Sequence, residues 1–208
     1  MLLLNNLINK KLAELILLIC IPGLQIFGQS EKNKLIFHDK AGDEIKIEQG
    51  SIMVNKIPLY LFTEPAIDYS SKLNRLIESG HSVFLFLVIY GSPNKDRLYG
   101  FRITPNKIDS VVDAIASEIK DFDKDGWLEF GGSDVNESHP SEDSMYYLPS
   151  AYYEIRNDNI RFDTLLTKKK DIRENGVYLK EKDQLDEKGY CCKVIAKPKK
   201  RKVIFANK

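Results

Sequence analysis

The stretch VFLFLVIY, residues 83–90, holds eight apolar residues in a row, with no alternation between apolar and polar positions. A strand that keeps one face in water alternates, so an unbroken apolar run predicts a strand with both faces buried. The turn-forming segment GSPNKD follows at 91–96, and RLYGFRI at 97–103 then returns as a second strand. We therefore expect residues 83–90 to form the central strand of an antiparallel sheet.

Further strands are expected on both sides of this hairpin. Upstream, KLIFHD (34–39) and EIKIE (44–48) flank the turn KAGD. IMVNKIPLYLF (52–62) follows, and Pro58 in it marks an edge strand or a bend. Downstream, strands are expected in MYYLPSAYYEI (145–155) and IRFDTLL (160–166). These stretches favour an antiparallel arrangement because short turns connect them.

Two segments have helical spacing of apolar residues. YSSKLNRLIES (69–79) has a stripe of Leu73, Leu76 and Ile77, and residues 106–120 place an apolar residue at nearly every third or fourth position. The sequence thus predicts an α+β fold: a single domain with an antiparallel sheet and about two short helices.

The first 29 residues have the layout of a secretory signal peptide. Lys10 and Lys11 precede an apolar run from Leu12 to Ile21, which is shorter than the ~20 residues of a membrane span. The FGQ ending at 27–29 resembles signal peptides of Bacteroidetes-type bacteria. We expect a secreted or periplasmic domain at 30–208. The alternatives are a lipoprotein attached through Cys20 and an N-terminal helix that packs on the domain.

Composition and cysteine usage narrow the classes of function. The chain of 208 residues is 43% hydrophobic and carries a net charge of +1, so no charge bias points to nucleic acid. The basic tail KPKKRK (197–202) is expected to be a solvated end. Cys191 and Cys192 lack the spacing and further ligands of a metal site, and we expect two half-buried thiols, or one cysteine that pairs with another chain.

The segment DFDKDGWLE, residues 121–129, concentrates negative charge in one short loop. Carboxylates at its first, third and fifth positions converge on a cation if the backbone curls, which Gly126 allows. A backbone carbonyl at the seventh position and a carboxylate at the ninth complete the set. The predicted ligands of a Ca²⁺ ion are therefore Asp121, Asp123, Asp125, Trp127 (through its carbonyl) and Glu129.

The pattern D-x-D-x-D-G-x-x-E resembles the calcium loops of EF-hand-like proteins, with residues 106–120 as the entering helix. The twelfth position departs from the EF-hand pattern, because Gly132 stands where that family has a bidentate glutamate. The loop is more similar to those of extracytoplasmic FG-GAP-type proteins, in which a strand follows. That resemblance implies a calcium site in a bacterial protein of the cell exterior, with Asp134 as a candidate additional ligand.

No catalytic constellation accompanies the loop, because His38, His81 and His139 are scattered and no hydrolase motif occurs. We therefore expect a calcium-binding protein that is not an enzyme, with a binding or structural role at the cell exterior. Its expected partner is a glycan, an envelope component or a protein, and inhibition of a hydrolase belongs to the same class. The alternative is a calcium-dependent extracellular hydrolase with unidentified catalytic residues.

Overall fold

The computed structural model describes residues 33–62, 66–91, 94–134, 140–189 and 191–198. The predicted signal peptide at 1–29, including Cys20, lies outside the described residues, as does most of the basic tail. Among the described residues, no helix has the length and apolar character needed to cross a membrane. The strands are β1 (Lys34–His38), β2 (Glu44–Glu48), β3 (Ser51–Val54), β4 (Ile57–Leu61), β5 (Arg75–Ser79), β6 (Ser82–Ile89), β7 (Arg97–Thr104), β8 (Lys107–Ile115), β9 (Leu128–Ser133), β10 (Ser144–Tyr146), β11 (Ser150–Arg156), β12 (Asn159–Phe162) and β13 (Val194–Ala196).

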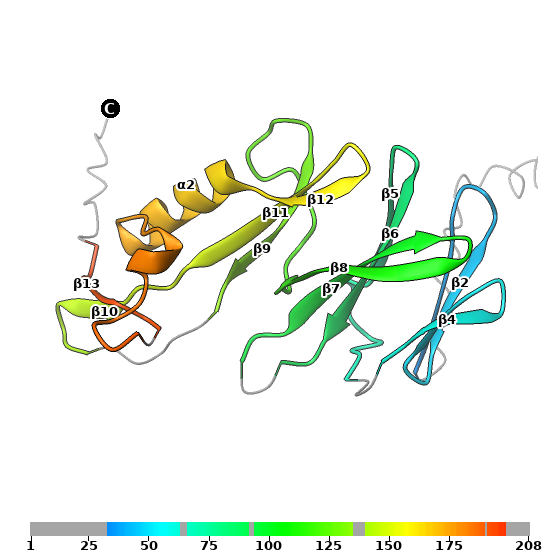
Figure 1. Ribbon diagram of the computed structural model, residues 1–208, viewed down its shortest axis with the longest axis horizontal. Helices are drawn as coiled ribbons and strands as arrows, with labels where there is room; N and C mark the ends of the chain where they lie inside the picture. Colours follow the sequence, from blue (N-terminus) through cyan, green and yellow to red (C-terminus); the bar gives the residue numbers. More distant parts are fainter. Residues whose placement is uncertain (1–32, 63–65, 92–93, 135–139, 190, 199–208) are drawn as a thin grey trace, which may run out of the picture.

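The strands form antiparallel sheets that stack in layers (Figure 1). The sheet β5-β6-β7-β8 lies in the middle, the sheet β1-β2-β3-β4 covers one of its faces, and the sheet β12-β11-β9 covers the other. A two-stranded sheet pairs β10 with β13. The predicted hairpins β1–β2 and β6–β7 are both confirmed.

Strand β6 is an interior strand that is buried on both faces, as its sequence predicts. Phe84, Phe86 and Val88 point into one hydrophobic core, which they share with β9 and β11. Leu85 and Leu87 point into a second core, which they share with the first sheet. The lack of alternation in 83–90 thus reflects two apolar layers, one on each side of the strand.

The predicted α+β class is wrong, because the chain is predominantly antiparallel β-sheet and both predicted helices are strands. Residues 75–79 form β5, and residues 107–115 form β8. The pairing of β8 with β7 shifts register opposite Gly100 and Phe101, so Ile108 and Val112 face different cores although they are four residues apart. This bulge produced the apparent helical spacing, and the β-branched content of the segment favours a strand.

The helix that the described residues do contain, α2 (Thr164–Asn175), was missed. The predicted strand 160–166 ends at Phe162, and Asp163 then caps the helix by accepting a hydrogen bond from the Leu166 amide at 2.8 Å. Gly176 ends the helix with a φ of 75°, a conformation that glycine adopts at little cost. The short 3₁₀ helix η1 (Glu181–Asp183) follows.

Helix α2 extends the hydrogen bonding of β11 beyond the end of β12. The inward side chains of Thr167, Asp171 and Asn175 bind the backbone of residues 152, 150 and 148 respectively. Four helical residues rise about 6 Å, and two strand residues advance about 6.7 Å. The helix therefore presents polar groups at nearly the repeat of a neighbouring strand, which explains why its buried face is polar.

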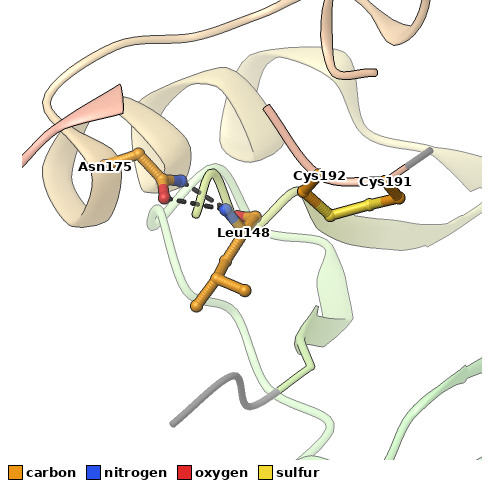
Figure 2. Close-up of a disulfide and its surroundings, with 4 residues drawn as sticks. All are labelled: Leu148, Asn175, Cys191 and Cys192. Carbon is orange, nitrogen blue, oxygen red and sulfur yellow. Dashed lines mark hydrogen bonds between the residues drawn. A yellow bond between two sulfur atoms is a disulfide. The ribbon is translucent and has the colours of Figure 1, made fainter. Parts of the chain in front are cut away.

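The last of these contacts is a two-bond pair between Asn175 and the backbone of Leu148 (Figure 2). The Leu148 amide donates to Asn175 Oδ1 at 3.0 Å, and Asn175 Nδ2 donates to the Leu148 carbonyl at 2.9 Å. A disulfide joins Cys191 to Cys192 in the same region, so the expectation of two half-buried thiols, or of a pairing with another chain, is wrong.

We predict that Asn175→Ala lowers the free energy of unfolding by about 1–2 kcal/mol, because both backbone groups of Leu148 lose their partner. Asn175→Asp should also destabilise, since it places a carboxylate oxygen against the Leu148 carbonyl. Urea unfolding followed by circular dichroism measures the change. Lys169→Ala, on the exposed side of the same helix, is the control, and equal stability of the Asn175 and Lys169 variants would contradict the assigned role.

Candidate metal centre

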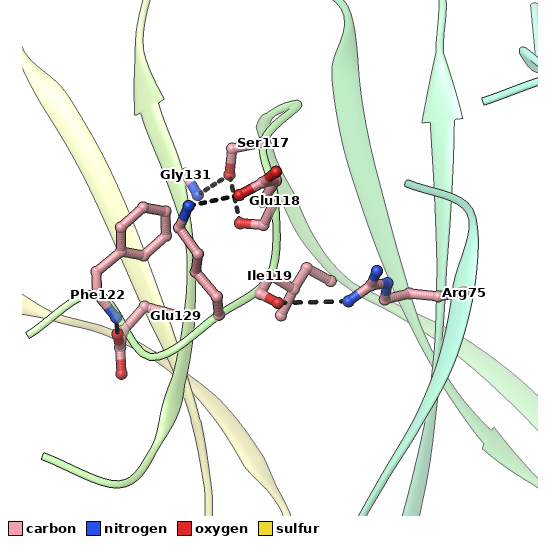
Figure 3. Close-up of polar contacts among 8 residues, drawn as sticks. Arg75, Ser117, Glu118, Ile119, Phe122, Glu129 and Gly131 are labelled. Atoms are coloured by element: carbon pink, nitrogen blue, oxygen red, sulfur yellow. Dashed lines mark hydrogen bonds and ion pairs between the residues drawn. The ribbon is translucent and has the colours of Figure 1, made fainter. Parts of the chain in front are cut away.

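The acidic loop lies in the segment that carries the chain from the middle sheet to the third sheet. Strand β8 ends at Ile115 and β9 begins at Leu128. The segment is attached at both sides: Arg75 of β5 donates to the Ile119 carbonyl at 3.3 Å, and the Gly131 amide of β9 donates to Ser117 Oγ at 2.8 Å (Figure 3). The entering helix that an EF-hand would place here is absent from the described residues 106–120.

Backbone hydrogen bonds close the base of the loop. Lys120 and Glu129 exchange two of them, at 3.0 and 2.9 Å, as an isolated antiparallel bridge. Glu129 belongs to β9, in agreement with the prediction that a strand follows the loop. The loop is therefore a closed turn with its two ends held side by side.

Asp121 organises the turn from inside. One carboxylate oxygen accepts the amides of Lys124 (2.6 Å) and Asp125 (3.2 Å), and the other accepts the amide of Gly126 (3.0 Å). Lys124 and Gly126 both have positive φ, at 69° and 96°, and glycine adopts such an angle without steric cost. The backbone thus curls around the first carboxylate, as the glycine position predicts.

The curl brings together the four predicted acidic ligands, Asp121, Asp123, Asp125 and Glu129. One carboxylate oxygen from each lies within 4.8 Å of the other three. The carbonyl of Trp127 stays a predicted fifth ligand; its amide donates to Asp125 Oδ1 at 3.0 Å within the same turn. Asp134, the candidate additional ligand, does not belong to the cluster.

Two oxygens of the cluster are buried without a hydrogen-bond partner. Glu129 is 1% exposed; its Oε2 accepts the Phe122 amide at 2.6 Å (Figure 3), but its Oε1 has no partner. Asp123 Oδ1 is likewise buried and unpartnered. A buried acceptor without a donor is costly, so these two oxygens are groups to which a cation could bind.

The electrostatics of the acidic cluster also favour a bound cation. Burial, and then the neighbouring charges of Asp123, Asp125 and Asp121, raise the pKa of Glu129 to about 7, although the Phe122 amide lowers it. Within the described part of the chain, no lysine, arginine or histidine nitrogen lies within 4.0 Å of these four carboxylates. The cluster is therefore not neutralised by any described side chain.

Aromatic and cationic side chains that were not predicted to act together surround the loop. Lys170 Nζ of α2 lies 4.6 Å from the centre of the Phe122 ring, and that ring packs edge-on against Tyr152. Burial is the main cause that lowers the pKa of Lys170. Arg156 stacks over the ring of Trp127 at 5.0 Å. Tyr152 and Glu154 lie two residues apart in β11 and therefore share one face of that strand.

The cluster suits a hard cation, because all of its donors are carboxylate oxygens and neither cysteine nor histidine is among them. No protein-family model, curated protein or solved structure matches the chain. The resemblance to calcium-loop proteins is therefore confined to the loop itself, where the shown feature is an acidic cluster that could hold a metal ion.

Proposed function

We propose that the chain is an exported calcium-binding protein in which the ion fixes the crossover between the middle sheet and the third sheet. The observation that carries the proposal is the pair of buried, unpartnered oxygens, Glu129 Oε1 and Asp123 Oδ1, in a cluster with no described counter-cation. A dication bound between them removes the repulsion among four carboxylates and satisfies both oxygens.

Calcium is favoured over other metals by the ligand count and by the curled loop. Four carboxylates and the carbonyl of Trp127 supply five oxygens, and calcium takes six to eight in variable geometry, so water or a second carboxylate oxygen completes the shell. Magnesium prefers octahedral sites and keeps several waters, and zinc prefers nitrogen and sulfur. Calcium is abundant outside cells, where sites of about 10⁻⁴–10⁻³ M affinity are filled.

Two features support a location at the cell exterior. The predicted signal peptide at 1–29 directs export, and the disulfide between Cys191 and Cys192 fits an oxidising compartment. In that setting the ion acts as a permanent structural element.

The role we propose is binding or structural, with the metal loop as the support of a surface. Trp127, stacked under Arg156, lies in the same turn as the ligands. Ordering the turn therefore orders an aromatic and cationic surface, which suits a glycan, an envelope component or a protein.

Calcium titration of the chelator-treated full chain tests the proposal. We expect binding by calorimetry with a dissociation constant of about 10⁻⁴ M, and a rise in melting temperature of about 5 °C at millimolar calcium. Trp127, the single tryptophan, reports the loop by fluorescence. Asp123→Asn should weaken calcium binding at least about tenfold, because it removes the charge of a buried ligand.

Asp123→Asn should have a second effect, on the stability of the metal-free protein, that an aspartate with a purely structural role would not show. Without metal, Asp123→Asn should raise the melting temperature, since it relieves repulsion in the cluster. Asp134→Asn, outside the cluster, is the matched control and should change neither quantity. The proposal is wrong if millimolar calcium leaves the melting temperature of the parent protein unchanged. It is also wrong if the Asp123→Asn variant binds calcium as tightly as the parent.

The raised pKa of Glu129 predicts how stability depends on pH. In the metal-free protein the folded state holds this proton up to about pH 7, whereas the ordinary value is 4.5. Its stabilising contribution is complete below pH 4.5 and is lost as the pH rises through 7. The melting temperature in chelator should therefore fall between pH 5.5 and 8, and the rise caused by calcium should be larger at pH 8.

Glu129→Gln separates this effect from other titrating groups. The variant has no proton to lose at this position, so its metal-free melting temperature should fall less than that of the parent over the same pH interval. It should also lose most of the calcium response. If parent and variant show parallel pH profiles in chelator, the carboxylate of Glu129 does not titrate as inferred.

A further inference from the structure

A second acidic site lies between helix α2, the start of β11 and the segment that contains η1. It is a cavity of about 490 Å³, within the range of small-molecule sites. Its described lining includes Ser150, Phe162, Asp171, Tyr178, Glu181 and Gln184. None of these residues belongs to the metal cluster, so the cavity is a separate feature.

The charge of the cavity is negative. Asp171 is fully buried at its floor, where it accepts hydrogen bonds from the Ser150 amide, at 2.9 Å, and from the Tyr147 hydroxyl. No described lysine, arginine or histidine nitrogen lies within 4.0 Å of its carboxylate. Glu181 adds a second carboxylate, and no described lining residue is cationic. Such a cavity concentrates cations, because little water screens the buried charge.

Two other polar groups of the lining have a free acceptor oxygen. Ser150, which is 6% exposed, has a buried hydroxyl oxygen with no hydrogen-bond partner. Gln184 uses its amide nitrogen on the Leu179 carbonyl at 3.0 Å, which leaves its amide oxygen as an acceptor. A ligand that donates hydrogen bonds can therefore satisfy both oxygens.

Two aromatic residues complete the walls. The ring of Phe162 is half exposed, and Tyr178 is half-buried on the segment that leads to η1. Aromatic faces bind apolar groups and attract organic cations through their π-electrons. The lining thus combines a site for positive charge with a site for an apolar body.

We propose that this cavity binds a small organic ammonium compound, with the ammonium group toward Glu181 and the buried charge of Asp171 and the apolar body against Phe162 and Tyr178. The ammonium group is a pure hydrogen-bond donor and carries the charge that the lining lacks. The proposal does not depend on the metal site, because the two share no residue.

A matched series of probes tests the inference: benzylamine, benzyl alcohol and benzoate, titrated into the full chain at pH 7 and low ionic strength by calorimetry. The three share one ring and differ in charge. We expect benzylamine to bind at least about tenfold more tightly than benzyl alcohol, and benzoate not to bind. Equal binding of benzylamine and benzyl alcohol, or no binding of benzylamine at about 10 mM, would overturn the proposal.

Two isosteric variants locate the binding. Glu181→Gln should weaken benzylamine about three- to tenfold and leave benzyl alcohol unchanged. Asp183→Asn removes the same charge from the same 3₁₀ helix, but Asp183 lies outside the described cavity lining. It should not change benzylamine binding. If the two variants weaken benzylamine equally, the attraction comes from net charge and not from this cavity.

Discussion

Strand β6 buries alternate side chains in two different hydrophobic cores, and this double burial constrains the rest of the chain. A sheet that is apolar on both faces needs a cover on each side. The first four strands supply one cover. The other must come from residues after β8, and the chain must cross between layers to supply it. The crossover 116–127 follows from that requirement.

The crossover is the place where the chain combines firm anchoring with unfavourable electrostatics. Arg75 and Gly131 hold its first half to strands of two sheets, and the exchange between Lys120 and Glu129 closes its second half. Because the backbone is fixed, the four carboxylates do not separate to relieve their repulsion. Holding like charges close together destabilises the folded protein when no metal is bound. The same rigid placement is the preorganisation that a metal site requires.

The sequence predicted those features that depend on local chemistry. The aspartates at alternate positions before Gly126, with Glu129, sufficed to predict the converging carboxylates, because the curl of the loop is determined by contacts within residues 120–129. The burial of both faces of residues 83–90 was also predictable from the sequence, since an unbroken apolar run in a sheet avoids water only when both faces are covered. Both predictions use contacts between residues close in the chain or a property of a single strand.

The secondary-structure predictions failed where the structure of a segment depends on residues far away in the sequence. Ile108 and Val112 have the spacing of a helix, but a bulge opposite Gly100 turns them to separate cores, and only the partner strand reveals it. Helix α2 was missed because its buried side is polar. Its cap Asp163 and its terminal Gly176 are helix signals in the sequence, and the prediction of a strand at 160–166 used neither of them.

The polar inner face of α2 explains one of the two acidic sites beside the third sheet, and the curl of the loop explains the other. Asp171 is buried because it replaces a strand in bonding the Ser150 amide, so a single charge is fixed beside a cavity. The loop instead gathers four carboxylates within 4.8 Å. Several close anions are best neutralised by a compact dication, whereas a lone buried anion with aromatic walls suits a larger monovalent cation. The difference between the two proposed ligands thus follows from how the backbone spaces the charges.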